Sequence, residues 1–359
     1  MFDALCFLII IFFMSNSSGS LYMNIVVDGA AANSFEAFYA FGDSYVDTGN
    51  GGYMGPPYGM TWPGHAAGRP CDGRNQVDHF AMLFGLPSPT PFKQMKNNES
   101  VGGINFGRSG GGVTYAFGYT PLDTQVDEFE ALVQEGVLLQ KHLANSVALV
   151  CLAVNDYSAY NGQGSPLGVP ELITTVVDGI ALNIMRIHQL GIRNIIVADL
   201  VLMACMPYIT ASVGYAHCSH NQTLRNETTQ HNLLLERRVN LLNQELAGSS
   251  AARIIIVDQT KAFWYLMHEG ASKYGFADHP LSPCCTDKED SRIQLCGNTD
   301  SEGRALYKVC KEPSQRVIFD GIHPTDAAWK AAIHLYSSVS GYTRCGPKLN
   351  TWITQRQRV

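Results

Sequence analysis

Short apolar runs alternate with amphipathic stretches along most of this chain. Four runs have the length and apolar character of buried strands: Phe35–Phe41, Val147–Val154, Asn194–Leu200 and Arg253–Asp258. Helical periodicity predicts helices between and after them: Glu171–Leu190, Thr229–Leu246 and Thr325–Ser338. Strands that alternate with helices favour an α/β fold, in which helices cover both faces of a parallel sheet. Ligands of such sheets bind outside the carboxyl ends of the strands, so the chemistry is expected there.

The first 20 residues follow a different pattern. Leu5–Met14 is an apolar run of the length found in secretion signals, too short for a bilayer, which needs about 20 residues. The small and polar residues Ser15–Ser20 follow it, and they suit a cleavage site. Asp3 and the absence of Lys or Arg before the run leave a buried strand or helix as the alternative. We expect a cleaved signal peptide over 1–20, a single domain over 34–345, secretion and no stable membrane anchor.

Composition narrows the class of protein. The 359 residues are 46% hydrophobic and 16% charged, which is typical of a globular chain with a sizeable core. The formal net charge is −6 and no Lys/Arg run occurs, which argues against nucleic acid as a partner. We expect a monomer.

The cysteine count is informative together with the expected secretion. Ten are present, and nine remain once Cys6 leaves with the signal, so at least one is a free thiol or pairs with another chain. An oxidising compartment favours disulfides over a zinc site built with His279. Cys205 and Cys218 suit one short loop, and a second group suits another, with its pairing left open: Cys284, Cys285, Cys296 and Cys310. Three sequons are candidate surface glycan sites: Asn98, Asn221 and Asn226.

Two of the predicted strands are followed by residues that could carry chemistry. Ser44 comes two residues after Gly42, where the chain can turn sharply and expose a hydroxyl at the edge of the sheet. Asn155 directly follows the run Val147–Val154, and its amide can donate a hydrogen bond into a cleft. Taken singly, each feature is more often an ordinary turn or helix cap.

A distant loop supplies a base with its own acid. A nucleophilic serine needs a base, and the base needs an orienting carboxylate. Asp320 and His323 are three residues apart, so a turn at Gly321 brings the carboxylate to the ring, and Pro324 holds His323 extended. The glycine-rich loop Gly107–Gly112 exposes N–H groups for an oxyanion or a phosphate, but it lacks the Lys-Ser/Thr ending of a P-loop.

Together these segments resemble the GDSL esterase/lipases of the SGNH hydrolase superfamily, most closely the secreted plant branch. The resemblance runs from about Phe38 to Ala328 through four blocks in order: FGDSYVDTGN, NFGRSGGGV, AVND and DGIHPT. AGRPCDGRNQVDHFA and the cysteine pattern near Cys284–Gly297 are also similar to the plant proteins. The resemblance implies a three-layer α/β/α fold with a central, mainly parallel, flavodoxin-like sheet.

The family's roles carry over residue by residue. The resemblance implies Ser44 as the nucleophile, His323 as the base and Asp320 as its orienting acid. The implied oxyanion hole combines the N–H groups of Ser44 and Gly110 with the Asn155 amide, and Gly111 is the alternative to Gly110. The chain departs from the family pattern at three places: Tyr45 for Leu, Ala153 for Gly, and Gly107-Arg108 in the second block.

The implied reaction is hydrolysis of a carboxylic ester through an acyl-enzyme, without metal or cofactor. Small esters, lipids and acylated polysaccharides all stay open as substrates. Because the base works only when neutral, activity should be lost at acid pH. Two alternatives remain: Ser109 as the nucleophile of a G-x-S-x-G elbow, and a non-catalytic cell-wall or glycan-binding protein on the same scaffold.

Overall fold

The computed structural model describes residues 35–52, 54–96, 100, 102–114, 116–163, 168–247, 253–276, 279–290 and 296–356. Contacts within the chain group Asn33–Val359 into one compact unit. The expected signal peptide over 1–20 lies outside the described residues. Within the described ranges, no helix combines the length and apolar character needed to span a bilayer.

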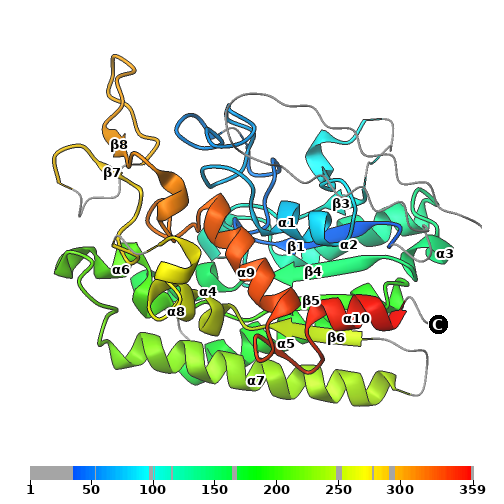
Figure 1. Ribbon diagram of the computed structural model, residues 1–359. Helices are drawn as coiled ribbons and strands as arrows, with labels where there is room; N and C mark the ends of the chain where they lie inside the picture. Colours follow the sequence, from blue (N-terminus) through cyan, green and yellow to red (C-terminus); the bar gives the residue numbers. More distant parts are fainter. Residues whose placement is uncertain are drawn as a thin grey trace, which may run out of the picture. The chain divides into compact units, whose positions relative to one another are not determined.

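A seven-stranded sheet forms the centre of this unit (Figure 1). Its middle consists of parallel, almost wholly buried strands: β1 (Phe38–Gly42), β4 (Val147–Cys151), β5 (Asn194–Ala198) and β6 (Arg253–Val257). Shorter strands lie at the edges: β3 (Ile104–Asn105) and β2 (Thr90–Pro91) beyond β1, and antiparallel β9 (Thr343–Arg344) beyond β6. Burial on both faces explains why the central strands are continuous apolar runs.

The strand order confirms the predicted fold. The sheet runs β2-β3-β1-β4-β5-β6-β9. Counted in chain order, the five strands β1, β3, β4, β5 and β6 have the flavodoxin-like order 2-1-3-4-5. The order reverses between β1 and β4, which pair in register from Phe38 opposite Val147 to Gly42 opposite Cys151. A binding crevice is expected at the carboxyl ends of these two strands.

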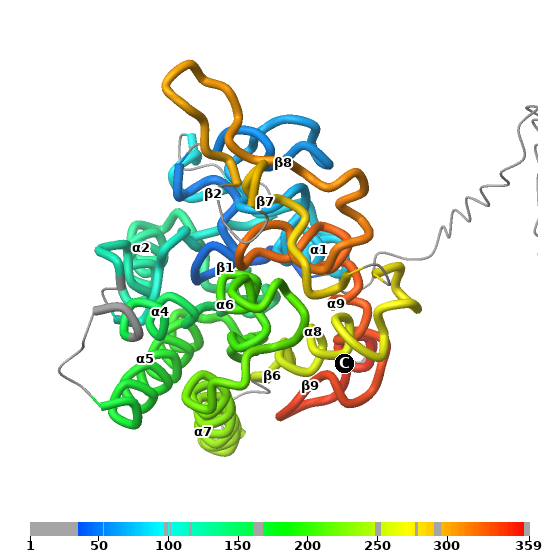
Figure 2. Tube along the Cα trace, turned by 90° about the vertical axis from the view of Figure 1, so that its left-hand side faces the viewer, coloured from blue at the N-terminus to red at the C-terminus, as the bar shows by residue number. Residues whose placement is uncertain are grey.

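Helices cover both faces of the sheet, as Figures 1 and 2 show together. One face carries α2 (Leu122–Gln134), α5 (Val169–Gln189) and α7 (Gln222–Leu246). The other carries α1 (Gln76–Leu83), α8 (Gln259–Met267), α9 (Asp326–Ser338) and α10 (Leu349–Arg356). Three short helices lie in the connections: α3 (Gln140–Leu143), α4 (Val154–Gln163) and α6 (Pro207–Thr210). Short 3-10 turns occupy further connections: Phe92–Gln94, Ala116–Gly118, Met203–Cys205, Ala211–Val213, Ser272–Tyr274 and Pro313–Gln315.

Some predicted boundaries were wrong. The first strand begins at Phe38 and not at Phe35, and Val154 belongs to α4 and not to the preceding strand. Helix α7 starts at Gln222, seven residues before the predicted start at Thr229. Its first turns bury polar side chains, including Glu227. Apolar periodicity therefore does not mark them.

The expected disulfides are confirmed. Cys205 pairs with Cys218, Cys284 with Cys310, and Cys285 with Cys296. The cysteines of the zinc alternative are thus bonded to one another. Three other cysteines are free thiols: Cys71, Cys151 and Cys345.

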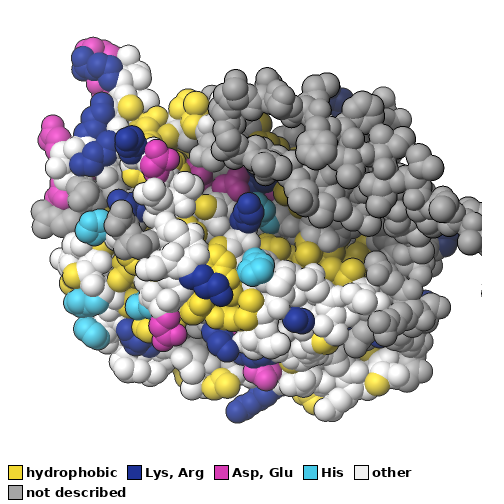
Figure 3. Space-filling model, in the orientation of Figure 1, with side chains coloured by type: hydrophobic (Ala, Val, Ile, Leu, Met, Phe, Trp, Pro, Cys, Tyr) yellow, Lys and Arg dark blue, Asp and Glu magenta, His cyan; other side chains and the backbone are white. Residues whose placement is uncertain are grey.

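Two of these disulfides, Cys284–Cys310 and Cys285–Cys296, hold a hairpin and the segment between its strands. Its strands are β7 (Cys285–Asp287) and β8 (Tyr307–Val309). In Figures 1 and 2 this orange segment lies beside the blue loops that follow β1. On the face drawn in Figure 3, charges of both signs are interspersed, in keeping with the small net charge of the chain.

Candidate active site

Ser44 is placed by a close approach between β1 and β4. Gly42 has φ +146°, and a Cβ there would lie 1.8 Å from the carbonyl oxygen of Cys151, so only glycine fits. The chain then turns, and the buried Asp43 side chain accepts the Tyr45 N–H at 2.9 Å. Burial raises the pKa of Asp43 to about 7. Ser44 follows the end of β1 with its hydroxyl at the crevice.

His323 joins Ser44 to Asp320. The Nε2 atom of His323 lies 2.9 Å from Ser44 Oγ, and its Nδ1 lies 2.8 Å from Asp320 Oδ2. Because a carboxylate only accepts, Nδ1 carries the proton of the neutral ring, which leaves Nε2 to accept from the serine hydroxyl. The structure therefore brings these three sequence-predicted residues into one hydrogen-bonded chain.

The Asp320 carboxylate is held on both oxygens. Oδ1 accepts the backbone N–H groups of Ile322 and His323, each at 2.9 Å. Oδ2 accepts His323 Nδ1 and also the hydroxyl of Tyr58 at 2.9 Å. Sequence reasoning missed Tyr58, since 262 residues separate it from Asp320 and no local pattern marks it.

The acid and the base shift each other's pKa. Burial works against both charges, but attraction between the two groups outweighs it. The pKa of Asp320 falls below its usual range, through the charge and hydrogen bonds of His323. The pKa of His323 rises above its usual value, through the charge and hydrogen bond of Asp320. This pairing stabilises the imidazolium that forms whenever His323 takes a proton.

Two expected oxyanion donors line the same cavity as Ser44. The cavity measures about 330 Å³ and includes Gly110 and Asn155 in its walls. Within the described ranges, neither the Ser44 N–H nor the Gly110 N–H has an acceptor, whereas Gly111 N–H donates to the carbonyl of Arg108 at 2.9 Å. Gly110 is therefore the better-placed donor of the two glycines.

Two buried carboxylates hold the glycine loop. Asp47 Oδ2 accepts both the N–H and the hydroxyl of Ser109 at 2.8 Å. Asp156 accepts the N–H groups of Val113 and Thr114 and the Thr114 hydroxyl. Gly110 lies between these anchors with φ +80°, close under the Tyr119 ring. Sequence reasoning missed the anchoring role of Asp47.

Comparisons with known proteins identify the family of the chain. The family model described as GDSL-like Lipase/Acylhydrolase matches residues 38–335. The chain belongs to this family. Two Arabidopsis thaliana proteins described as GDSL esterase/lipases are 36% and 33% identical to it, each over 82% of this chain and 83% and 85% of their own lengths. Among solved structures, an acetyl xylan esterase variant from Geobacillus stearothermophilus aligns at 14% identity with a TM-score of 0.41, over 87% of this chain and 97% of that one.

Membership of the GDSL family confirms the predicted enzyme class, a carboxylic ester hydrolase. The hydrogen bonds of Ser109 bear on the elbow alternative. Ser109 Oγ is bonded to Asp47, whose oxygens already accept the N–H groups of Gly49, Asn50 and Gly51. Within the described ranges no histidine is bonded to Ser109, so that serine lacks the base that an elbow requires.

The cavity of this GDSL protein has a mixed lining, in which the polar residues are Asp43, Ser44, Ser109, Asn155 and His323. Its apolar lining comprises Tyr45, Met54, Pro70, Tyr119, Val154 and Ile322. Tyr45, which stands where the family has leucine, donates its hydroxyl to the carbonyl of Ile322 at 2.9 Å. Its ring lies edge-on to the His323 ring, with centroids 6.0 Å apart. Tyr45 therefore connects the turn that carries Ser44 to the loop that carries His323.

Two of the three candidate glycan sites are exposed at the start of α7. Asn221 is the exposed N-cap of α7, where its side-chain oxygen accepts the Thr223 N–H at 2.9 Å. Asn226 is exposed one turn further along α7. Asn98 lies outside the described residues.

Proposed function

We propose that this chain hydrolyses carboxylic esters by two-step acyl transfer, with Ser44 as nucleophile, His323 as base and Asp320 as orienting acid. The hydrogen-bonded chain Asp320–His323–Ser44, at the edge of a cavity of about 330 Å³, is the observation that carries the proposal. All three residues come from one chain, so the proposed site requires no partner subunit.

In the first step, Ser44 Oγ attacks the ester carbonyl carbon while its proton passes to His323 Nε2. The carbonyl oxygen gains a full negative charge. Hydrogen bonds from the N–H groups of Ser44 and Gly110 and from the Asn155 amide stabilise this charge. Protonated His323 then gives its proton to the departing alcohol oxygen, and the C–O bond of the ester breaks. The acyl group remains on Ser44.

In the second step, His323 deprotonates a water molecule that attacks the acyl-enzyme. The same donors hold the second oxyanion. Ser44 recovers its proton as it leaves, and the carboxylic acid is released. The mechanism balances without a metal or a cofactor.

The apolar side chains in the cavity wall, among them Met54, Tyr119 and Val154, suit the hydrocarbon part of an acyl ester or lipid. We propose further that the chain is secreted and glycosylated. The apolar run Leu5–Met14, the three disulfides and the exposed sequons at Asn221 and Asn226 support this.

A serine-reactive fluorophosphonate tests the nucleophile. It should label the wild type and the Ser109→Ala variant, and it should not label Ser44→Ala. Labelling that persists in Ser44→Ala and vanishes in Ser109→Ala would favour the elbow. A folded wild type that takes no label would favour a non-catalytic binding protein.

A further inference from the structure

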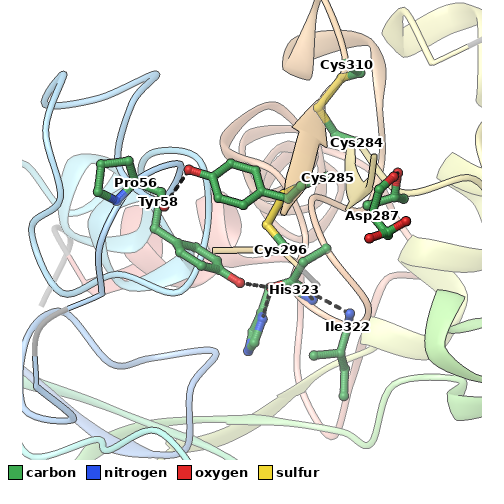
Figure 4. The surroundings of a disulfide bond; sticks show 12 residues. Pro56, Tyr58, Cys284, Cys285, Asp287, Cys296, Cys310, Ile322 and His323 are labelled. Atoms are coloured by element: carbon green, nitrogen blue, oxygen red, sulfur yellow. Dashed lines mark hydrogen bonds and ion pairs between the residues drawn. A yellow bond between two sulfur atoms is a disulfide. The ribbon is translucent and has the colours of Figure 1, made fainter. Parts of the chain in front are cut away.

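The Tyr58 hydroxyl meets the same oxygen of Asp320 that binds His323. Its distance to Asp320 Oδ2 is 2.9 Å, and the distance from His323 Nδ1 to that oxygen is 2.8 Å. Figure 4 shows the Tyr58 ring pointing toward the loop that carries Ile322 and His323. Tyr58 is 8% exposed and Asp320 is 5% exposed, so water competes little for this bond.

Aromatic packing fixes the Tyr58 ring. The ring packs edge-to-face on Phe319, with centroids 5.5 Å apart, in a buried cluster with Cys284 and Cys285. A separate hydrogen bond in this cluster runs from the Tyr307 hydroxyl to the carbonyl of Pro56 at 2.8 Å, and it involves neither the Tyr58 hydroxyl nor Asp320.

The segment that leads into Asp320 is fixed by the same disulfide-stapled hairpin. Backbone N–H groups of Cys284 and Cys285 donate to the carbonyls of Ile318 and Phe319, at 3.0 and 2.6 Å. Both cysteines are buried and disulfide-bonded, to Cys310 and Cys296. The donor and the acceptor of the Tyr58–Asp320 bond are therefore held by one scaffold.

We propose that Tyr58 is a positioning residue for the acid of the triad, an inference that rests on the proposed function. Asp320 Oδ1 is occupied by two backbone donors, which leaves Oδ2 to be shared between Tyr58 and His323. The tyrosine hydroxyl fixes the plane of the carboxylate. By donating to Oδ2 it also reduces the negative charge with which this oxygen stabilises protonated His323. Burial and the neighbouring Asp320 raise the pKa of Tyr58, so its hydroxyl keeps the proton it donates.

The Tyr58→Phe variant removes only the hydroxyl and keeps the ring against Phe319. The carboxylate should then be less well oriented, and kcat should fall about ten-fold, the effect of one weakened hydrogen bond to a charged group. KM should stay within about two-fold, because Tyr58 does not line the cavity. Since Oδ2 then carries more charge, the pKa of His323 should rise, and the acid limb of kcat/KM should move to higher pH.

Tyr307→Phe is the matched control. It removes a hydroxyl from the same cluster but makes no contact with Asp320, so kcat and the pH profile should not change. Replacing Tyr58 with difluorotyrosine, a stronger donor, should move the acid limb to lower pH. The difluorotyrosine variant keeps both the ring and the hydroxyl of Tyr58, so the fold should be preserved.

Titration of His323 by NMR in 15N-histidine-labelled protein makes the test independent of turnover. An upward shift of its pKa in Tyr58→Phe supports the inference even if Ser44→Ala still hydrolyses esters, which would defeat the proposed function alone. If Ser44→Ala is inactive while Tyr58→Phe keeps the wild-type kcat and His323 pKa, the inference is wrong and the proposed function stands. Equal losses in Tyr58→Phe and Tyr307→Phe would also overturn the inference, because they would indicate a structural role only.

Discussion

Replacement of Asn155 by alanine tests the oxyanion hole most directly. The Asn155 amide donates one N–H to the carbonyl of Gly111 at 2.8 Å, and its second N–H is left for the cavity shared with Ser44 and Gly110. The variant thus removes one of three proposed donors. Loss of such a donor raises the barrier by about 2.7–4 kcal/mol, which is about 10²–10³ in kcat. The broken Gly111 contact should lower the free energy of unfolding by only about 1 kcal/mol.

Steady-state hydrolysis of p-nitrophenyl esters of graded acyl length measures both kcat and KM. We expect kcat to fall and KM to change little, because the donor acts on charge that exists only in the transition state. Thr114→Val is the control, since it removes the 2.6 Å hydroxyl contact to Asp156 in the same loop without removing a cavity donor. A folded Asn155→Ala variant with kcat within about three-fold of wild type would refute the assignment. So would an equal loss in Thr114→Val.

Three further predictions follow from the same contacts. Because Asp320 holds the pKa of His323 above its ordinary 6.5, kcat/KM should fall as the pH drops through a value above 6.5, and a flat profile there would contradict the role of His323. Because the pKa of His323 is higher in the folded than in the unfolded state, the folded state binds the imidazole proton more tightly. The resulting contribution to the free energy of unfolding is fully present below pH 6.5 and is lost as the pH rises through the folded-state pKa. Asp47→Ala leaves several backbone N–H groups without an acceptor and should therefore lower kcat. It should also lower the free energy of unfolding in urea by about 3 kcal/mol or more. Unchanged stability would show that water replaces the carboxylate. Replacing both Cys285 and Cys296 with serine should lower the unfolding free energy by about 2–4 kcal/mol in denaturant titrations, and an unchanged midpoint would show that the bond adds no stability.

The central strands could be predicted because burial on both faces leaves a direct mark on the sequence. Each is a run of apolar residues, and the positions that follow β1 and β4 therefore stand out in the sequence alone. Contacts between distant segments leave no such mark. Asp47 and Ser109 are 62 residues apart, and Tyr58 and Asp320 are 262 apart. Polar residues in such contacts look like ordinary loop residues until the fold brings them together.

The reversal of strand order explains why the proposed nucleophile and one proposed oxyanion donor follow neighbouring strands. Ser44 follows β1 and Asn155 follows β4, and these strands approach so closely at Gly42 and Cys151 that no side chain fits between them. That approach sets the spacing between attacking oxygen and amide donor within the rigid sheet. The proposed base and acid come instead from the loop before α9, which makes side-chain contacts with Tyr45 and Tyr58. We therefore expect deletion of a single hydroxyl to change the geometry of the proposed proton transfer more than the spacing between Ser44 and Asn155.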